Sequence, residues 1–412
     1  MSDKIIMYGC YLLGIMVLAM ISRFANVPFL TGYGLLLIGY AFMARRLSIL
    51  SHGDLAWLIA IALLGRCLLL AKAPLLSDDL YRCLWEGKII RHGFNPYLLP
   101  PDSDTLAFLR DTYYPFINHP SLTAIYPPLM LAINAVIGWL YYSPVFYKIV
   151  MTGFDLLAVT VMFWLLSREH LPRRRIMLYV MHPLPLMEIS WSGHHEAVMV
   201  AAMMLTLLLF AGRRWGAAGL ALAAAVLTKF VPLIMVGECR RKGSLLGLAT
   251  VIVLVYLPFV LTGSSPFSSL STYAQHWQFN ASLYTLGTFF VNNHLALRFL
   301  LAGGYAVFWV LVNIYEPRRY RRQVWLFFGL LLVSPTVHPW YGLWLLPFLV
   351  LEPVLELFLF VSFLPFSYVV LERYLQAGIW QEQYLVTGLI YLPAGWYVVK
   401  TLGALRLRHP RQ

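Results

Sequence analysis

Two adjacent aspartates begin the segment of this sequence that is best suited to acid–base chemistry. Asp78 and Asp79 follow Ser77, and the segment runs with helical spacing to Arg91, with Gly93 just beyond it. This pattern predicts an amphipathic helix with Ser77 as its N-cap and both carboxylates in the first turn. The helix dipole favours ionised carboxylates there, and such a carboxylate can accept a proton from a hydroxyl group. A capped surface helix with ordinary ion pairs would show the same pattern.

More polar side chains follow on this segment. Arg82 is on the same helix face as the aspartates, and Glu86 lies four residues beyond it. Arg82, Lys88 and Arg91 could donate hydrogen bonds to phosphate. The chain then continues as a loop rich in proline and aromatic residues, and long ordered loops of this kind are usually functional. It supplies further candidate substrate-binding residues: Asn95, Tyr97, His119 and Tyr126.

Composition places these residues in a membrane protein. Hydrophobic residues make up 60% of the chain and charged residues only 12%, against about 25% charged in soluble domains. Roughly twelve to fourteen apolar blocks occur, many near spanning length and none with the alternation of barrel strands. The sequence therefore predicts an all-α, polytopic transmembrane helical bundle. We expect a single membrane domain over residues 1–412, with an extramembrane catalytic loop at 73–125 that carries amphipathic helices along the membrane surface.

The net charge of +13 comes from short basic clusters between apolar blocks. This positive-inside pattern indicates contact with anionic membrane lipid and gives no support to nucleic-acid binding. It puts the loop 73–125 on the outer side, but two apolar blocks, 126–142 and 144–166, would then leave the arginines at 173–175 outside. Either one block does not cross the membrane, or these arginines face outward and meet an anionic ligand.

Three other places carry polar residues within apolar sequence, where a charge or imidazole is costly and indicates function. In the stretch 220–237, Lys229 and Pro232 lie between basic clusters, which predicts a broken or re-entrant helix. Lys229 and His338 could also bind phosphate. Lys229 could instead extend its ammonium group to the membrane interface. Glu196 and its neighbouring histidines could simply cap the helix that begins there. The candidates from these places are His194, His195 and Glu196 in SGHHEA, Lys229, and His338, Trp340 and Tyr341 in SPTVHPWY.

Motifs of soluble nucleotide-sugar enzymes and hydrolases are missing. The sequence contains no HExxH, no CxxC pair, no glycine-rich phosphate loop and no GxSxG elbow. A soluble nucleotide-sugar or hydrolase site therefore has no support. We expect no cofactor; a metal could bind at the aspartate pair, but we predict none, because basic residues could suffice for a phosphate.

Five segments, in this order, resemble the bacterial polyprenyl-phosphate-sugar-dependent mannosyltransferases of the GT-C superfamily: SDDLYRCLWEGKIIRHGFNPY, INHPSLTAIYPP, HHEAVMVAAMM, AGLALAAAVLTKFVP and SPTVHPWYGLWLLPF. The resemblance spans about residues 70 to 350. It implies a GT-C type bundle in which Asp78 or Asp79 is the general base and Glu196 and His338 line the same cavity. The chain departs from many relatives in having two apolar blocks before the span that leads into the loop, and in having Cys83 and Glu86 where tyrosine and aspartate are common.

The resemblance implies a function in cell-envelope glycan biosynthesis. A hexose, mannose by the resemblance alone, would pass from a polyprenyl-phosphate donor to a lipid or glycan acceptor, with inversion. The enzyme would lie in the bacterial cytoplasmic membrane with its active site facing the periplasm. Two alternatives share many of these features: a ligase or polymerase of lipid-diphosphate-linked glycans, and a transporter or flippase of lipid-linked sugars. A transporter should show paired repeats and intramembrane carboxylates, whereas the densest acidic motif here lies in a loop.

Overall fold

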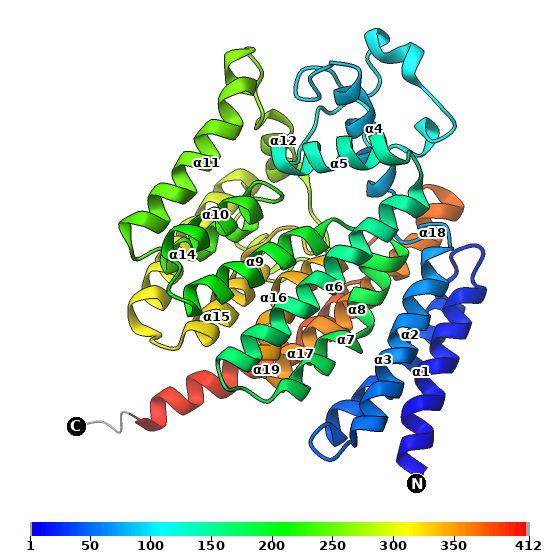
Figure 1. The fold of residues 1–412 in the computed structure, drawn as a ribbon, viewed down its shortest axis with the longest axis vertical. Coiled ribbons are helices and arrows are strands. Elements are labelled where there is room, and N and C mark those ends of the chain that lie inside the picture. The colour runs from blue at the N-terminus through cyan, green and yellow to red at the C-terminus, as the bar shows by residue number, and fades with distance from the viewer. Residues whose placement is uncertain (1, 409–412) are drawn as a thin grey trace.

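The apolar blocks form helices, because a helix satisfies its own backbone hydrogen bonds in a solvent that offers none. The computed structural model describes residues 2–408 (Figure 1). Over that range it contains helices, turns and one isolated β-bridge between Phe279 and Thr336, with no strand. The predicted all-α class is confirmed.

Eight helices of the described residues are long and apolar enough to cross a membrane, which indicates an integral membrane protein. They are α1 (Ser2–Met20), α2 (Asn26–Arg46), α3 (His52–Leu70), α6 (Pro144–Arg168), α11 (Lys242–Leu261), α14 (His294–Tyr315), α19 (Tyr384–Arg408) and the stretch Leu355–Ala377. The last of these consists of α17 (Leu355–Phe363), the 3₁₀ helix η7 (Leu364–Val369) and α18 (Val370–Ala377).

Shorter helices fill the space between the long ones. Four are apolar: α5 (Pro128–Leu140), α9 (Glu196–Ala211), α10 (Trp215–Val226) and the stretch Pro339–Leu351, which consists of η6 (Pro339–Tyr341) and α16 (Gly342–Leu351). The remaining elements are α4 (Asp79–Arg91), η1 (Asp104–Leu109), η2 (Tyr114–Phe116), η3 (Arg173–Ile176), α7 (Met177–Val180), α8 (Pro183–Pro185), the π-helix η4 (Leu186–Trp191), η5 (Val231–Glu238), α12 (Ser268–His276), α13 (Leu283–Gly287) and α15 (Arg319–Val333).

Helix α5 bears on the question of how the arginines at 173–175 are placed relative to the loop 73–125. It lies beside α4 across one end of the bundle, and α6 then runs the length of the molecule (Figure 1). The arginines after α6 therefore reach the opposite end, where Arg174 donates to the carbonyl of Ser48 at 2.6 Å. Ser48 follows the basic pair Arg45 and Arg46. The first of the two alternatives requires a block that does not cross the membrane, and α5 fits this, since it has only 13 residues and lies across one end of the bundle (Figure 1).

Close packing holds α5 against α4. A Cβ atom at Gly87 would lie 2.3 Å from the backbone oxygen of Asn134 on α5. Only glycine permits this approach, because even a methyl group would push the two helices apart. Helices α4 and α5 thus form one layer.

Helix α4 differs in two ways from the predicted helix. It begins at Asp79 with Asp78 at the N-cap position, one residue later than expected. Ser77 is therefore not the N-cap, although its hydroxyl accepts a hydrogen bond from the backbone N–H of Asp79 at 3.3 Å. Most of the helix is also buried, including Arg82 and Glu86. It packs between α5 and the loop, so it is more enclosed than an amphipathic surface helix.

The predicted broken helix is present at residues 227–230. Helix α10 ends at Val226, and η5 begins at Val231. The guanidinium of Arg241, just after η5, lies 5.6 Å from the ring of Trp215, the first residue of α10. The chain therefore enters and leaves this excursion at the same place. At its tip, the carbonyl of Leu227 accepts a hydrogen bond from the N–H of Met130 on α5.

Candidate active site

The two aspartates are joined by an amide from another part of the loop. Nδ2 of Asn118 donates to Oδ1 of Asp78 at 2.7 Å and to Oδ1 of Asp79 at 2.8 Å. Asp78 is exposed, whereas the Asp79 side chain is only 25% exposed. Asn118 therefore fixes both carboxylates, and Asp79 is the one that turns inward.

The environment of Asp79 changes its acidity. Burial, together with the negative charge of neighbouring Asp78, raises the pKa of the Asp79 carboxyl to about 6, although the hydrogen bond from Asn118 acts in the opposite direction. A general base works best when its pKa is near the working pH, because it is then both ionised and basic. Asp79 meets that condition better than an ordinary exposed aspartate.

A buried imidazole connects Asp79 to the helices of the bundle. Nδ1 of His194 lies 3.9 Å from Oδ2 of Asp79, and Nε2 lies 3.6 Å from Oε2 of Glu188. The His194 ring stacks on Trp340 with ring centroids 4.1 Å apart. Trp340 in turn stacks on His338 at 4.3 Å, with the two planes nearly parallel. Residues from two distant segments, 188–194 and 338–340, thus lie together beside Asp79.

An ion pair lies near the same nitrogen of His194, whose Nδ1 is also 4.0 Å from Oε2 of Glu196. Lys229, at the tip of the α10–η5 excursion, pairs with Glu196, the first residue of α9. Its ammonium group also lies 5.2 Å from the ring of Tyr341 and 5.4 Å from that of Trp344. These rings stabilise a cation through their π faces. The break in the helix therefore serves to deliver one positive charge to this cluster.

Several buried polar atoms at the cluster have no hydrogen-bond partner among the described residues: Ser192 Oγ, His194 Nε2, His195 Nε2 and Glu196 Oε2. Buried polar groups in native proteins are nearly always bonded, so a group of unpaired ones needs an explanation. All four belong to residues 192–196, which form the turn beneath Asp79 and beside Lys229. We interpret this turn as the floor of a site whose polar ligand supplies the missing partners.

Comparison with known proteins identifies the family of this chain. Residues 6–239 match the family model described as alpha-(1->6)-mannopyranosyltransferase, N-terminal domain. The chain belongs to this mannosyltransferase family. No curated protein and no solved structure matches it. The predicted enzyme class, a glycosyltransferase of the GT-C mannosyltransferase type, is confirmed by this match.

The residues of the candidate site lie partly inside and partly outside the range that matches the mannosyltransferase family. Asp79, Glu196 and Lys229 lie inside the matched residues. The stacked wall of His338, Trp340 and Tyr341 lies beyond them, between α15 and α16. The cluster therefore needs both parts of the chain.

Arg82 has a different role from the one predicted. Its Nε donates to Glu86 at 3.0 Å, and its two terminal nitrogens donate to the carbonyls of four loop residues. These carbonyls belong to Asn118, His119, Leu122 and Thr123. A guanidinium has five N–H donors, and all five are used here. Arg82 and its partner Glu86 hold the turn that carries Asn118, and neither is free to bind phosphate.

The other predicted residues of the loop also serve its structure. Lys88 binds the carbonyl of Leu109 and the carboxylate of Asp111, and Arg91 donates to the carbonyl of Gly138. Asn95 accepts from the N–H of Tyr97, whose hydroxyl donates to the carbonyl of Tyr126. Lys88, Arg91, Asn95 and Tyr97 are thus bonded to the protein itself and lie away from the cluster.

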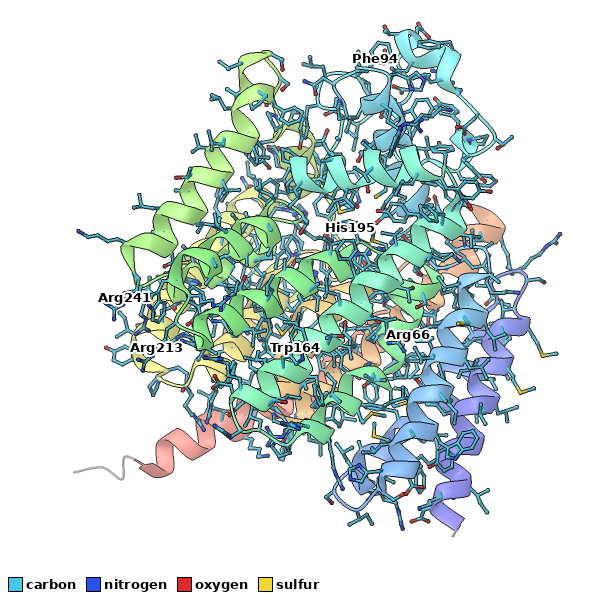
Figure 2. The ribbon with its side chains drawn as sticks, viewed as in Figure 1. Arg66, Phe94, Trp164, His195, Arg213 and Arg241 are labelled. Carbon is cyan, nitrogen blue, oxygen red and sulfur yellow. The ribbon has the colours of Figure 1, made fainter. Side chains whose placement is uncertain are left out.

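Two predicted aromatic contacts lie closer to the mannosyltransferase cluster. The ring of Tyr126 meets that of His195 edge-on at 4.2 Å, and His195 lies in the interior of the molecule near α5 and α6 (Figure 2). His119, in the turn held by Arg82, contacts Trp277 at 4.8 Å. Tyr126 and His195 therefore line the cluster from beneath α5, whereas His119 lies at its outer edge.

Sequence reasoning missed four residues of this cluster. They are Asn118, Glu188, Tyr273 and Trp344. Asn118 stands in the quoted loop segment next to His119, and Glu188 is the one acidic residue in an apolar run, which could have indicated it. The hydroxyls of Tyr273 and Tyr341 lie 2.7 Å apart, a contact that no sequence pattern predicts.

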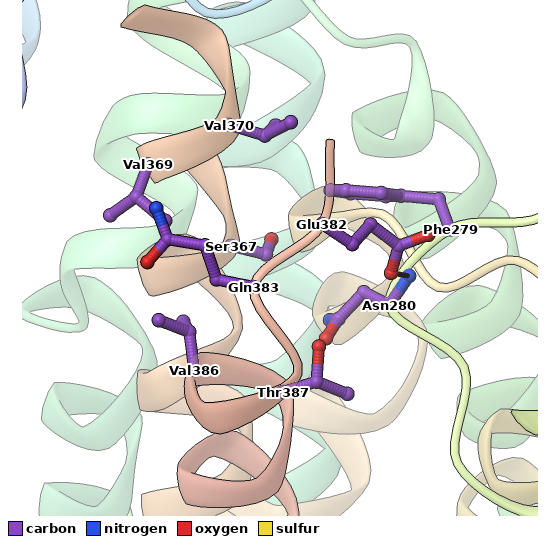
Figure 3. A pocket seen from close by; sticks show the side chains of 9 residues that line it. All are labelled: Phe279, Asn280, Ser367, Val369, Val370, Glu382, Gln383, Val386 and Thr387. Atoms are coloured by element: carbon purple, nitrogen blue, oxygen red, sulfur yellow. Dashed lines mark hydrogen bonds between the residues drawn. The ribbon is translucent and has the colours of Figure 1, made fainter. Parts of the chain in front are cut away.

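A small hollow borders the wall but does not suit a sugar. It lies between the end of η7 and the start of α19, and the carboxylate of Glu382 there accepts from the N–H of Asn280 at 2.6 Å (Figure 3). Its volume of about 10 Å³ corresponds to roughly one water molecule. Phe279, which also lines it, packs on His338 at 5.2 Å. The hollow is therefore too small for a sugar, and its lining residue Phe279 instead packs against His338.

The side chains that commonly bind metals are not clustered in the part of the chain that the structure describes. Among residues 2–408, no group of three or more His, Cys, Asp and Glu side chains could hold a metal ion. That the reaction needs no metal or cofactor stays a prediction.

Proposed function

We propose that this mannosyltransferase transfers mannose from a polyprenyl-phosphate donor to a lipid or glycan acceptor, with Asp79 as the general base. One observation carries the proposal: an inward-facing carboxylate with a raised pKa lies near a partly buried cation and a turn of unpaired polar atoms. A base, a phosphate partner and a sugar-binding surface are the three parts that such a transfer requires.

The base acts on the acceptor. Asp79 removes the proton of an acceptor hydroxyl as its oxygen attacks C1 of the donor mannose. The bond between C1 and the phosphate oxygen breaks, and the lipid phosphate leaves with the bonding electrons. Attack on the opposite side inverts the configuration, so the alpha linkage in the family's name would require a β-linked donor. Asn118 holds Asp79 in the direction of attack.

The departing phosphate needs positive charge. The Lys229 ammonium has three N–H donors and uses one on Glu196. Its other donors can bind phosphate oxygens, and the rings of Tyr341 and Trp344 keep the ammonium in place. His194 and His338 add imidazole nitrogens to the same side. The predicted phosphate-binding set of five thereby narrows to Lys229 and His338.

The aromatic wall suits the sugar. The face of a mannose ring carries C–H groups that pack on aromatic side chains, and its hydroxyls need polar partners. Tyr341 and Tyr126 provide aromatic contacts, and Trp340, already stacked on His194 and His338, supports them. Ser192, His195 and Glu196 provide the unpaired polar atoms.

The position in the molecule agrees with a site on the outer face of a bacterial cytoplasmic membrane. His195 lies just below α5, whereas the basic residues Arg213 and Arg241 lie at the left edge of the view, farther from α4 and α5 (Figure 2). Positive clusters usually mark the cytoplasmic side. We therefore propose that the loop 73–125 faces the periplasm.

A transfer assay tests the proposal. Purified protein is given radiolabelled polyprenyl-phosphate-mannose and a membrane lipid or glycan extract, with Asp79→Asn alongside. We expect labelled product from the wild type and none from the variant. Transfer from a lipid-diphosphate donor instead would favour the ligase, and movement of the intact donor across liposomes without transfer would favour the flippase. Either result overturns the proposal.

A further inference from the structure

The far end of the molecule contains a large hollow that the transfer reaction does not use. It measures about 810 Å³, within the range of roughly 300–1,000 Å³ for ligand sites. Its walls come from the turn after η5, the turn before α15, the start of α10 and the end of α6. The charged residues that line it are Arg240, Arg241, Arg318, Arg319, Arg322, Glu169, Glu238 and Glu352.

Two of the three acidic residues of this hollow are paired with arginines, and the third, Glu169, lies beside Tyr320. Glu238 is buried and accepts from Arg319, Arg322 and Gln323. Glu352 lies 3.7 Å from Arg318. These contacts fix the floor of the hollow and use up much of its negative charge.

Two arginines at the rim keep free donors. Arg240 makes one long contact of 3.5 Å, to the carbonyl of Asn313. Arg241 stacks on Trp215, which orients its guanidinium without using its N–H groups. Neither forms an ion pair with a carboxylate in the described part of the chain. Two oriented guanidinium groups facing one hollow are well suited to a phosphate, because each presents a planar fork of donors.

The surroundings favour a lipid over a soluble anion. The hollow lies where α11 begins and α14 ends, and the last turn of α14 and the first of α11 carry exposed apolar side chains: Leu245, Leu246, Leu311, Ile314 and Tyr315. Apolar side chains directly beside a phosphate site would contact acyl chains while the headgroup enters the hollow. We propose that this hollow binds the phosphate-bearing headgroup of an anionic membrane lipid.

Native mass spectrometry of the full chain in detergent tests this. Phosphatidylglycerol is titrated against the wild type and against Arg240→Gln/Arg241→Gln. The matched control is Arg213→Gln/Arg214→Gln, which removes the same charge from an exposed pair outside the hollow. We expect one retained lipid in wild type and control, and binding roughly ten- to thirtyfold weaker in the hollow variant, from about 1 kcal/mol per arginine.

Further control measurements distinguish specific lipid binding from general surface attraction and from binding of a soluble anion. Phosphatidylcholine should bind much more weakly, and millimolar inorganic phosphate should not displace the lipid. Equal losses in both double variants would show general surface attraction, and binding of inorganic phosphate alone with the same affinity would show a soluble-anion site. Each of these results rejects the proposal. If the double variant unfolds, Arg240→Gln alone should still weaken binding, and an unchanged affinity there counts against the site.

Discussion

Oδ2 of Asp79 and Nδ1 of His194 lie 3.9 Å apart, although the two residues are more than a hundred positions apart in the chain. Through this approach α4 meets the turn that begins α9. The carboxylate proposed as the general base and the imidazole beside it therefore belong to different helical segments of the molecule. Any change that moves α4 relative to α9 should alter the reaction.

Replacing Asp79 should be far more harmful than replacing Asp78. Asp79→Asn keeps the volume and the contact with Asn118 but cannot accept a proton, so we expect kcat to fall by roughly 10²–10⁴-fold. Asp78→Asn, at the exposed N-cap, should retain most activity. The measurement is initial transfer rate with both variants at equal folded concentration. Equal losses, or activity in Asp79→Asn, would reject the assignment of the base.

The rate should depend on pH through Asp79. Its pKa is raised to about 6, and the base is active only when ionised, so kcat/KM should rise with pH up to about 6 and then level. Because the charge of Asp78 contributes to the raised pKa, Asp78→Asn should move this limb to lower pH. A pH–rate profile of the two proteins shows it. An unmoved limb would mean that another group titrates.

Arg82 should act through the position of Asn118. Arg82→Lys keeps the charge but cannot reach four carbonyls at once. Losing charge-assisted hydrogen bonds costs about 1.5–3 kcal/mol each, so we expect lower kcat and faster hydrogen exchange at residues 118–123. Arg110→Gln, an exposed loop arginine bonded to the carbonyl of Asp102, is the control. Loss of donor affinity with unchanged exchange would instead indicate that Arg82 binds phosphate.

Lys229 and Glu196 should behave as a coupled pair. Removing one partner of a buried ion pair costs about 3–5 kcal/mol, because the other charge remains unpaired. Glu196→Gln and Lys229→Gln should each reduce folded stability, and the double variant should recover part of that loss. Transfer should stay low wherever Lys229 is absent. A thermal-unfolding cycle combined with rates checks this, and simple additivity of the stability changes would refute the coupling.

Gly87→Ala should loosen the layer of α4 and α5. The new methyl group would meet the backbone of Asn134, and overpacking of this kind costs roughly 1–3 kcal/mol. Gly153→Ala on α6 is the control, since a Cβ there has open space. Melting temperature and transfer rate are compared for both. If the two variants are equally stable, the close approach has no energetic role.

From the sequence alone, we could point to those residues of the cluster that are unusual in their local sequence. Lys229, His338 and Glu196 stood out because a charge or imidazole in apolar sequence is costly. The role of Arg82 could not be read in the same way, because its partners are backbone carbonyls, which every residue has. The path of α5 was also ambiguous, since its 13 residues are apolar enough to be read as a span and only packing against Gly87 decides.

The wall formed by His338, Trp340 and Tyr341 has a consequence for synthesis of the protein. Asp79, Glu196 and Lys229 leave the ribosome first, and their cluster stays open on one side until the segment at 334–344 has been made and inserted. A nascent chain that stops after residue 239 would hold Asp79 and Lys229 but not these three aromatic side chains. If the proposed site is correct, the membrane would then contain an early intermediate that cannot yet bind the sugar to be transferred.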